Sequence, residues 1–136
     1  MKEEELTGKI IGCAMKVHRT LGGGFLESVY QNALAFELQR SGLQAECEVP
    51  IKVFYDGVDV GEFFADILVA KQIIVENKAV EQLNPAHEVQ LVNYLTATTY
   101  NVGLLFNFGA ASLQYKKKFR VYRKADTNPV NPEKSC

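Results

Sequence analysis

The sequence predicts one α/β domain in which helices pack against a mixed β-sheet. Three observations lead to this fold class. Apolar residues recur with the period of a helix over the first 40 residues, and the period then changes to the alternation of a strand. Later in the chain, residues 101–108 form a nearly continuous apolar run, which is typical of a strand covered on both faces. The expected order of elements is α-α-β-β-β-α-β-β.

Two helices are expected first. Residues 5–21 carry one apolar stripe, and the glycines at 22–24 end this helix, because glycine accepts the left-handed conformation that a C-cap needs. The second helix is expected over residues 25–40, where a serine and a glycine follow. Its buried stripe is predicted to consist of Leu26, Val29, Ala33, Leu34, Phe36 and Leu38.

A β-hairpin is expected next. Residues 47–55 alternate between apolar and polar side chains, which predicts a strand. Pro50 places this strand at a sheet edge or at a bulge, since proline lacks an N–H group. The dipeptide Asp56-Gly57 is a hairpin signal that leads into a return strand over residues 58–69.

The remaining elements continue the sheet and cover it. A third strand is expected over residues 73–80, after a short polar link. The dipeptide Asn84-Pro85 favours the start of a helix, which should run to about residue 98. The apolar strand at 101–108 follows, and an exposed basic strand is expected over 113–123.

Composition limits what the chain can do. Its 136 residues suffice for one domain with a core, expected over 1–124 and followed by a flexible C-terminal tail over 125–136. The net charge of −1 argues against a protein coated with positive charge, and the three cysteines lack the spacing of a zinc site. No apolar run could span a bilayer and the acidic start lacks a signal-peptide core, so we expect a cytoplasmic protein with no membrane partner.

Charged side chains gather where the third predicted strand ends. Glu76 and Lys78 are two residues apart, so they point to the same face of a strand. If the link at 70–72 forms a three-residue loop, Asp66 lies directly opposite Glu76 and the two carboxylates share a face. A two-residue loop would place Asp66 opposite Val75, on the wrong face.

Such a group of charges can support phosphodiester hydrolysis. Two carboxylates with room for water suit Mg²⁺, or Mn²⁺, and the metal polarises a phosphodiester and activates a bound water. A neighbouring lysine can orient that water or neutralise the charge that develops on the phosphate. The alternative for so short a motif is a surface ion pair at the end of a strand.

Further segments of the chain extend this motif. Residues 24–30 read G-F-L-E-S-V-Y and match the signature GxxExxY. Four more segments agree in order and spacing, namely residues 65–69, 75–79, 90–95 and 102–109. From about residue 10 to residue 122, the chain resembles the GxxExxY protein family, which is grouped with the PD-(D/E)XK nuclease superfamily. The resemblance implies a restriction-endonuclease-like core, a mixed β-sheet flanked by helices, and a nuclease-like site.

The resemblance also implies roles for the charged residues. Asp66 and Glu76 would be metal ligands, and Lys78 would be the catalytic lysine. Glu27 would be the first-helix carboxylate that completes the metal site and the catalytic set. The residue before Asp66 is Ala65 rather than the proline of the superfamily name. Capping of the second helix is the plainer alternative for Glu27.

Three further residues are assigned supporting roles. Gln90 and Tyr94 resemble the QxxxY element of RecB-like members, where it supports the site and contacts DNA. Tyr30 closes the GxxExxY signature. The plainer alternatives are a polar helix rim for Gln90 and Tyr94, and a core aromatic with a hydrated hydroxyl for Tyr30.

A basic run lies near the end of the predicted domain. It is either a solvated edge strand or a surface that contacts phosphates, and its candidate nucleic-acid-binding residues are Lys116, Lys117, Lys118 and Arg120. We expect a Mg²⁺-dependent nuclease acting on DNA. The alternative is a non-catalytic module that binds nucleic acid or a partner on a nuclease-like fold. A homodimer would double the basic surface of a small, slightly acidic protein.

Overall fold

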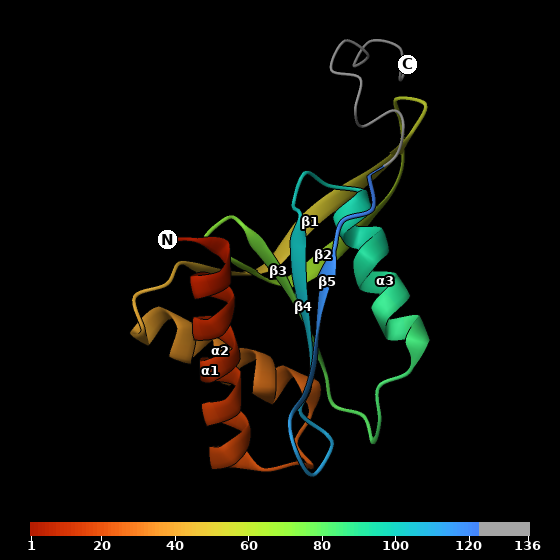
Figure 1. Ribbon diagram of the computed structural model, residues 1–136. Coiled ribbons are helices and arrows are strands. Elements are labelled where there is room, and N and C mark those ends of the chain that lie inside the picture. The colour runs from red at the N-terminus through yellow and green to blue at the C-terminus, as the bar shows by residue number, and fades with distance from the viewer. Residues whose placement is uncertain (123–136) are drawn as a thin grey trace.

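A computed structural model describes residues 1–122, and its elements follow the predicted order (Figure 1). The predicted tail lies outside the described residues. One mixed sheet has the strand order β1-β2-β3-β4-β5, in which β3 and β4 are parallel and the other neighbours are antiparallel. The elements are α1 (Glu3–Leu21), α2 (Glu27–Arg40), β1 (Ala45–Tyr55), β2 (Val58–Val69), β3 (Ile73–Lys78), α3 (Pro85–Thr96), β4 (Val102–Asn107) and β5 (Gln114–Phe119).

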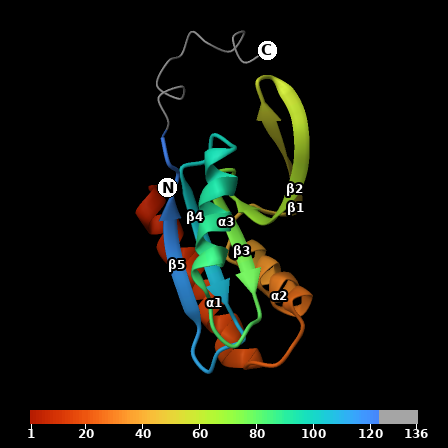
Figure 2. The same ribbon diagram turned by 90° about the vertical axis from the view of Figure 1, so that its right-hand side faces the viewer.

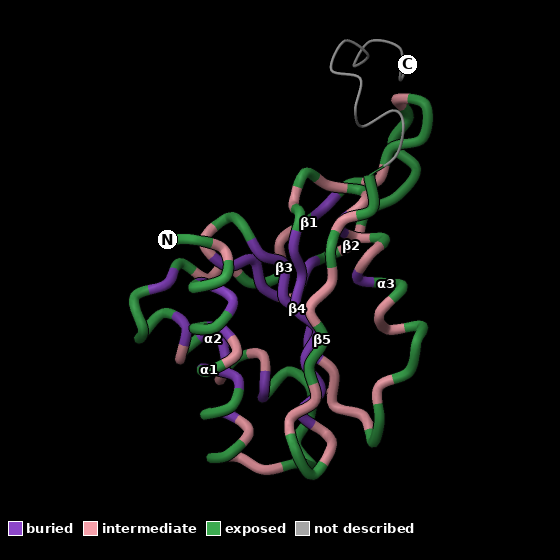
Figure 3. The backbone as a smooth tube through the Cα atoms, in the orientation of Figure 1, coloured by how far each residue is buried: buried purple, intermediate pink, exposed green. Residues whose placement is uncertain are grey.

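The sheet lies between two helical layers. Helices α1 and α2 cover one face, and α3 covers the other (Figures 1 and 2). Every residue of β4 is buried, which confirms the prediction of a strand covered on both faces. Figure 3 shows that buried residues concentrate in the middle of the sheet. None of the helices in residues 1–122 is long and apolar enough to cross a membrane.

The hairpin of β1 and β2 extends beyond the helical layers (Figures 1 and 2). Its turn is Asp56-Gly57, with φ values of 52° and 78°, and a turn with two positive φ values matches the twist of the flanking strands. β1 has β2 as its neighbour and lies at the edge of the sheet, so the prediction made from Pro50 is confirmed.

The second helix differs from the prediction. It begins at Glu27 rather than at residue 25, and it buries Tyr30, Leu34, Ala35 and Leu38. Three residues of the predicted stripe are exposed instead, namely Leu26, Val29 and Phe36. The side chains of Tyr30, Leu34 and Leu38 repeat every four residues and define the face that meets the sheet. The predicted apolar stripe does not include Tyr30, so the observed face is rotated relative to the predicted one.

Several element ends also differ. β3 ends at Lys78, α3 ends at Thr96, and β5 ends at Phe119, each before the predicted boundary. The start of α3 is as predicted: the Asn84 side chain accepts a hydrogen bond from the Ala86 N–H at 2.8 Å, and Pro85 occupies the first turn.

A polar contact fixes the chain where it leaves β3. Asn107 Oδ1, at the end of β4, accepts the N–H groups of Val80 at 2.9 Å and of Gly109 at 3.0 Å, and Asn107 Nδ2 donates to Gln114 Oε1 at 2.8 Å. Glycine is required at position 109, because a Cβ atom there would lie 2.4 Å from the carbonyl oxygen of Val80. The end of β3, with Lys78, is therefore held against the end of β4.

Candidate active site

The site lies where β2 and β3 separate. Val69 pairs with Ile73 and Ile67 with Val75, so the link between the strands holds three residues, as the predicted site requires. Continued by one step, this register sets Asp66 opposite Glu76. Here side chains replace the backbone ladder: Glu76 Oε2 accepts the N–H of Asp66 at 2.9 Å, and Asp66 Oδ2 accepts the N–H of Asn77 at 2.8 Å.

Burial makes both carboxyl groups hard to ionise. Burial raises the pKa of Asp66 to about 6, and the negative charges of Glu27 and Glu48 add to the rise. Burial likewise raises the pKa of Glu76 to about 8, with the charge of Asp66 as the next cause. The hydrogen bonds from the backbone and the charge of Lys78 act in the opposite direction on both groups.

Lys78 provides the positive charge of the site. It follows Glu76 by two residues on β3, so both side chains belong to one face of the strand. Its side chain is half-buried. Among the ion pairs of the described residues, none involves Lys78, although its charge is close enough to lower the pKa of both carboxyl groups. The ammonium group can therefore donate hydrogen bonds to a water or a phosphate bound at the site.

Glu27 approaches the pair from α2. It is exposed in the first turn of that helix, and its charge raises the pKa of Asp66. No side-chain capping bond is made at the N-cap position, which is Leu26. In residues 1–122, no group of three or more His, Cys, Asp and Glu side chains is placed to hold one metal ion. The structure thus brings Asp66 and Glu76 into contact, with Glu27 at longer range.

The pair by itself fits a magnesium ion. The backbone hydrogen bonds use Oδ2 of Asp66 and Oε2 of Glu76, which leaves one oxygen of each carboxylate for a cation. Mg²⁺ is commonly held by one or two carboxylates and keeps several waters. A cation would also relieve the repulsion between the negative charges of the half-buried Asp66 and the buried Glu76.

Tyr30 packs in the core and bonds to the backbone before α2. It is fully buried, and its ring stacks on Phe108 with a centroid distance of 4.8 Å. Its hydroxyl donates to the Gly22 carbonyl at 2.5 Å and accepts the N–H of Phe25 at 3.2 Å. The core alternative is therefore correct for the ring, while the hydroxyl bonds to the backbone and fixes the turn that presents Glu27.

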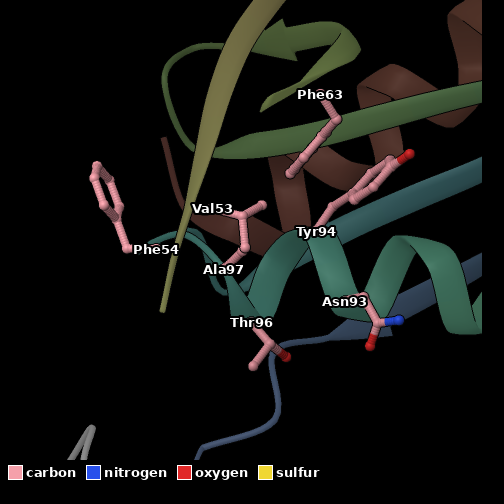
Figure 4. Close-up of a pocket in the computed structure, with 7 residues that line it drawn as sticks. All are labelled: Val53, Phe54, Phe63, Asn93, Tyr94, Thr96 and Ala97. Carbon is pink, nitrogen blue, oxygen red and sulfur yellow. The ribbon is translucent and has the colours of Figure 1, made fainter. Parts of the chain in front are cut away.

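Gln90 and Tyr94 lie on the face of α3 that approaches the carboxylates. Burial raises the pKa of Tyr94, and the charges of Glu76 and Asp66 add to the rise. A hydrogen bond from Gln90 acts in the opposite direction. The ring of Tyr94 stacks on Phe63 of β2, with centroids 3.6 Å apart (Figure 4). Tyr94 thus connects α3 with β2, and Gln90 hydrogen-bonds to it from the same helix.

Comparison with protein-family models matches residues 4–120 to the PD-(D/E)XK nuclease superfamily. The chain belongs to this superfamily. Neither the comparison with curated proteins nor that with solved structures gives a match. Superfamily membership confirms the nuclease-like fold that the sequence predicted, and it makes nucleic acid the expected substrate class.

One acidic residue near this PD-(D/E)XK site was not predicted. Glu48 lies between the pairs Cys47–Ile67 and Val49–Ala65, at the level of Asp66, and has a φ of 52°. Its carboxylate accepts a hydrogen bond from Gln31 Nε2 at 2.9 Å. Its charge raises the pKa of both Asp66 and Glu76. In the sequence it is one polar residue of an alternating strand, and nothing local signals the positive φ.

The basic strand β5 does not present one uniform surface. Lys117 pairs with Glu3 of α1 at 2.7 Å, and Lys118 pairs with Glu88 of α3 at 3.1 Å, so these neighbours reach the two opposite faces of the sheet. Both ion pairs reduce the charge available to phosphates. Lys116 has no ion pair among the described residues. Arg120 donates from Nε to the carbonyl of Thr98 at 2.8 Å.

Asn77 is fully buried, and neither its Oδ1 nor its Nδ2 atom has a hydrogen-bond partner among residues 1–122. Burying an unpaired amide costs about 1–3 kcal/mol. Asn77→Leu, which keeps the size of the side chain, is therefore expected to raise the free energy of unfolding by about 1–3 kcal/mol in urea titrations.

Asn107 supplies the matched control for this change. Its amide makes three hydrogen bonds, so Asn107→Leu should lower the free energy of unfolding. A loss of stability with Asn77→Leu that equals the loss with Asn107→Leu would show that the Asn77 amide is satisfied.

The raised pKa values predict how the metal-free protein responds to pH. The unfolded values are near 3.8 for Asp66 and 4.5 for Glu76, and the folded values are about 6 and about 8. The folded state therefore binds more protons than the unfolded state between about pH 4 and pH 8, and stability falls as the pH rises through this range.

The expected loss in the free energy of unfolding is on the order of a few kcal/mol, because a shift of one unit in a pKa corresponds to about 1.4 kcal/mol. Urea titrations in EDTA at pH 5, 6.5 and 8 measure it. The double variant Asp66→Asn, Glu76→Gln should flatten the dependence, whereas Glu62→Gln, an exposed carboxylate on the same strand, should leave it unchanged. An equal slope in wild type and double variant would contradict the assignment.

Proposed function

We propose that this PD-(D/E)XK protein is a Mg²⁺-dependent nuclease that hydrolyses phosphodiester bonds in DNA, and that Mn²⁺ can replace Mg²⁺. The observation that carries the proposal is the contact between the buried Glu76 and the half-buried Asp66, beside a lysine that forms no ion pair with them. In a structural ion pair, Lys78 would neutralise the carboxylates. In a site that binds a cation and a phosphate, the carboxylates must be free to bind the cation and the lysine must be free to meet the phosphate.

Each side chain of the site has a separate proposed role. Asp66 and Glu76 would hold the metal through their remaining oxygens, with Glu27 contributing from α2. When bound, the metal polarises the phosphodiester and lowers the pKa of a coordinated water. Lys78 orients the attacking water or neutralises charge on the phosphate. Tyr94 packs α3 against Phe63 of β2, Gln90 hydrogen-bonds to Tyr94, and Tyr30 holds the turn before Glu27.

DNA binding is proposed to use the basic residues of β5 and its continuation, chiefly Lys116, with Lys117, Lys118 and Arg120 contributing once their protein partners are exchanged for phosphates. A homodimer is proposed as the binding form, since a second subunit doubles this surface. The basic run in the sequence supports DNA binding, and the small size and slightly acidic charge of the chain support the homodimer. We also propose the cytoplasmic location expected from the sequence.

A second function is favoured by one observation. The carboxylates of Asp66 and Glu76 each accept a backbone N–H, which gives them a structural reason to be present without catalysis. A non-catalytic module that binds nucleic acid or a protein partner is therefore the rival proposal.

A cleavage assay separates the two. Labelled single-stranded, duplex and branched DNA are incubated with the protein in Mg²⁺, Mn²⁺ or EDTA. The nuclease proposal expects products in either metal and none in EDTA, and it expects Asp66→Asn to abolish cleavage while Glu62→Gln retains it. Binding without cleavage of any of the three DNAs would select the module.

A further inference from the structure

A pocket of about 390 Å³ opens where β1, β2 and α3 meet (Figure 4). Its lining consists of Val53, Phe54, Phe63, Asn93, Tyr94, Thr96 and Ala97. Phe63 stands three residues before Asp66 on β2, a separation of about 10 Å along a strand. The pocket therefore shares strand β2 with Asp66. Its lining residue Tyr94 stacks on Phe63 and lies near enough to Asp66 and Glu76 that their charges raise the pKa of its hydroxyl.

Three aromatic side chains, those of Phe54, Phe63 and Tyr94, line the pocket together with the polar residues Asn93 and Thr96. Phe63 is half-buried and lies face to face with Tyr94, with an angle of 13° between the rings. Phe54, of which 61% is exposed, borders the pocket from β1. Figure 4 shows the side chains of Asn93 and Thr96 turned away from the ring pair. The surface offered to a ligand is thus a platform for stacking.

We propose that this pocket binds an unpaired nucleobase next to the phosphodiester at the site, so that the substrate is single-stranded DNA or a single-stranded end. The inference rests on the proposed nuclease function and specifies its substrate. Superfamily membership supplies the substrate class, and the aromatic pocket supplies the reason for preferring unpaired bases.

The physical basis is base stacking. Every base has an aromatic face, so stacking on a side chain accepts any sequence. A base inside a duplex already stacks on its neighbours, and it must be extruded at a cost before it can enter a pocket. At about 390 Å³, the pocket lies near the lower end of the range for ligand pockets and fits one base. Because the polar groups turn outward, we expect little sequence preference.

Fluorescence tests the proposal without any need for cleavage. The chain has no tryptophan, so Phe63→Trp creates a single reporter at the pocket. In EDTA, oligothymidylate is expected to quench this fluorescence, while an abasic strand with the same number of phosphates leaves it unchanged. Phe64→Trp, at an exposed neighbour outside the pocket, should respond to neither strand. Quenching at position 63 by blunt duplex as strong as by oligothymidylate would overturn the single-strand assignment.

Affinity measurements provide the second test. Phe63→Ala is expected to weaken binding of oligothymidylate by about 5- to 160-fold, which corresponds to ~1–3 kcal/mol for loss of one stacked base. Phe63→Leu keeps the apolar volume and should also weaken binding. The matched control Phe64→Ala should bind as the wild type does. Wild-type affinity in both Phe63 variants would overturn the pocket.

The two proposals fail differently. Cleavage of DNA by a protein whose affinity is unaffected by Phe63→Ala would keep the nuclease and reject the pocket. Base-dependent quenching in a protein that cleaves no nucleic acid would reject the nuclease and keep the pocket.

Discussion

Lys78→Ala is expected to reduce the single-turnover rate of DNA cleavage by about two to three orders of magnitude. If the ammonium group acts on the water or on the developing phosphate charge, its interaction is strongest in the transition state, and loss of one such preorganised group elsewhere has an effect of this size. The same variant should change DNA affinity by no more than a few-fold, because one phosphate contact is a small share of binding. Rapid-quench assays at saturating DNA measure the first quantity, and salt-dependent affinities measure the second.

Two comparisons make this result specific. Lys9→Ala removes an exposed lysine of α1 and should change neither quantity. Changing Lys116, Lys117 and Lys118 together to Ala should weaken binding and flatten its salt dependence, while cleavage at saturating DNA is retained. The ion pairs of Lys117 and Lys118 imply that Lys116 accounts for the largest part of this loss. Wild-type cleavage that Lys78→Ala leaves intact would refute the catalytic role of Lys78.

Mg²⁺ and Mn²⁺ are expected to raise the melting temperature of the wild-type protein, and the double variant Asp66→Asn, Glu76→Gln is expected to lose this rise completely. A ligand that binds the folded state alone stabilises it by mass action, by about 2.7 kcal/mol at a concentration 100 times its Kd. The gain should increase from pH 6 to pH 8.5, since both carboxyl groups must release their protons to bind a metal.

Differential scanning calorimetry with and without metal measures the shift. The amides of the double variant still accept the two backbone hydrogen bonds, so the variant is expected to fold. Glu62→Gln keeps the full metal effect. A metal-induced shift of wild-type size in the double variant would place the metal elsewhere.

The sheet and the carboxylate pair were predictable because their signals are local. Alternation predicted β1, and Asp56-Gly57 predicted the hairpin. The length of the link at 70–72 stayed open between two and three residues, and the observed three-residue link places Asp66 opposite Glu76. Ten residues separate Asp66 from Glu76, so no distant packing was needed to bring them together.

What was missed depends on tertiary contacts. The face of α2 is set by Tyr30, which is buried because Phe108 and the Gly22 carbonyl receive it. Lys117 and Lys118 are paired because Glu3 and Glu88 stand on helices on either side of β5. The first two features depend on residues distant in the chain, which periodicity does not reach. Glu48 combines a positive φ with a charge that raises the pKa of Asp66 and Glu76, and nothing in the neighbouring sequence indicates either property.

The hydrogen bonds that Asp66 and Glu76 accept from the backbone bear on how relatives of this protein should be judged. Each carboxylate oxygen takes the place of a backbone carbonyl in the β2–β3 ladder, so a relative without catalytic activity would still need an acceptor oxygen at both positions. Aspartate and glutamate supply this oxygen, and so do their amides. The side chain of Lys78 forms no ion pair among the described residues, so folding does not require it in this way. In an alignment, we expect inactive relatives to keep an acid or its amide at positions 66 and 76 and to vary at position 78.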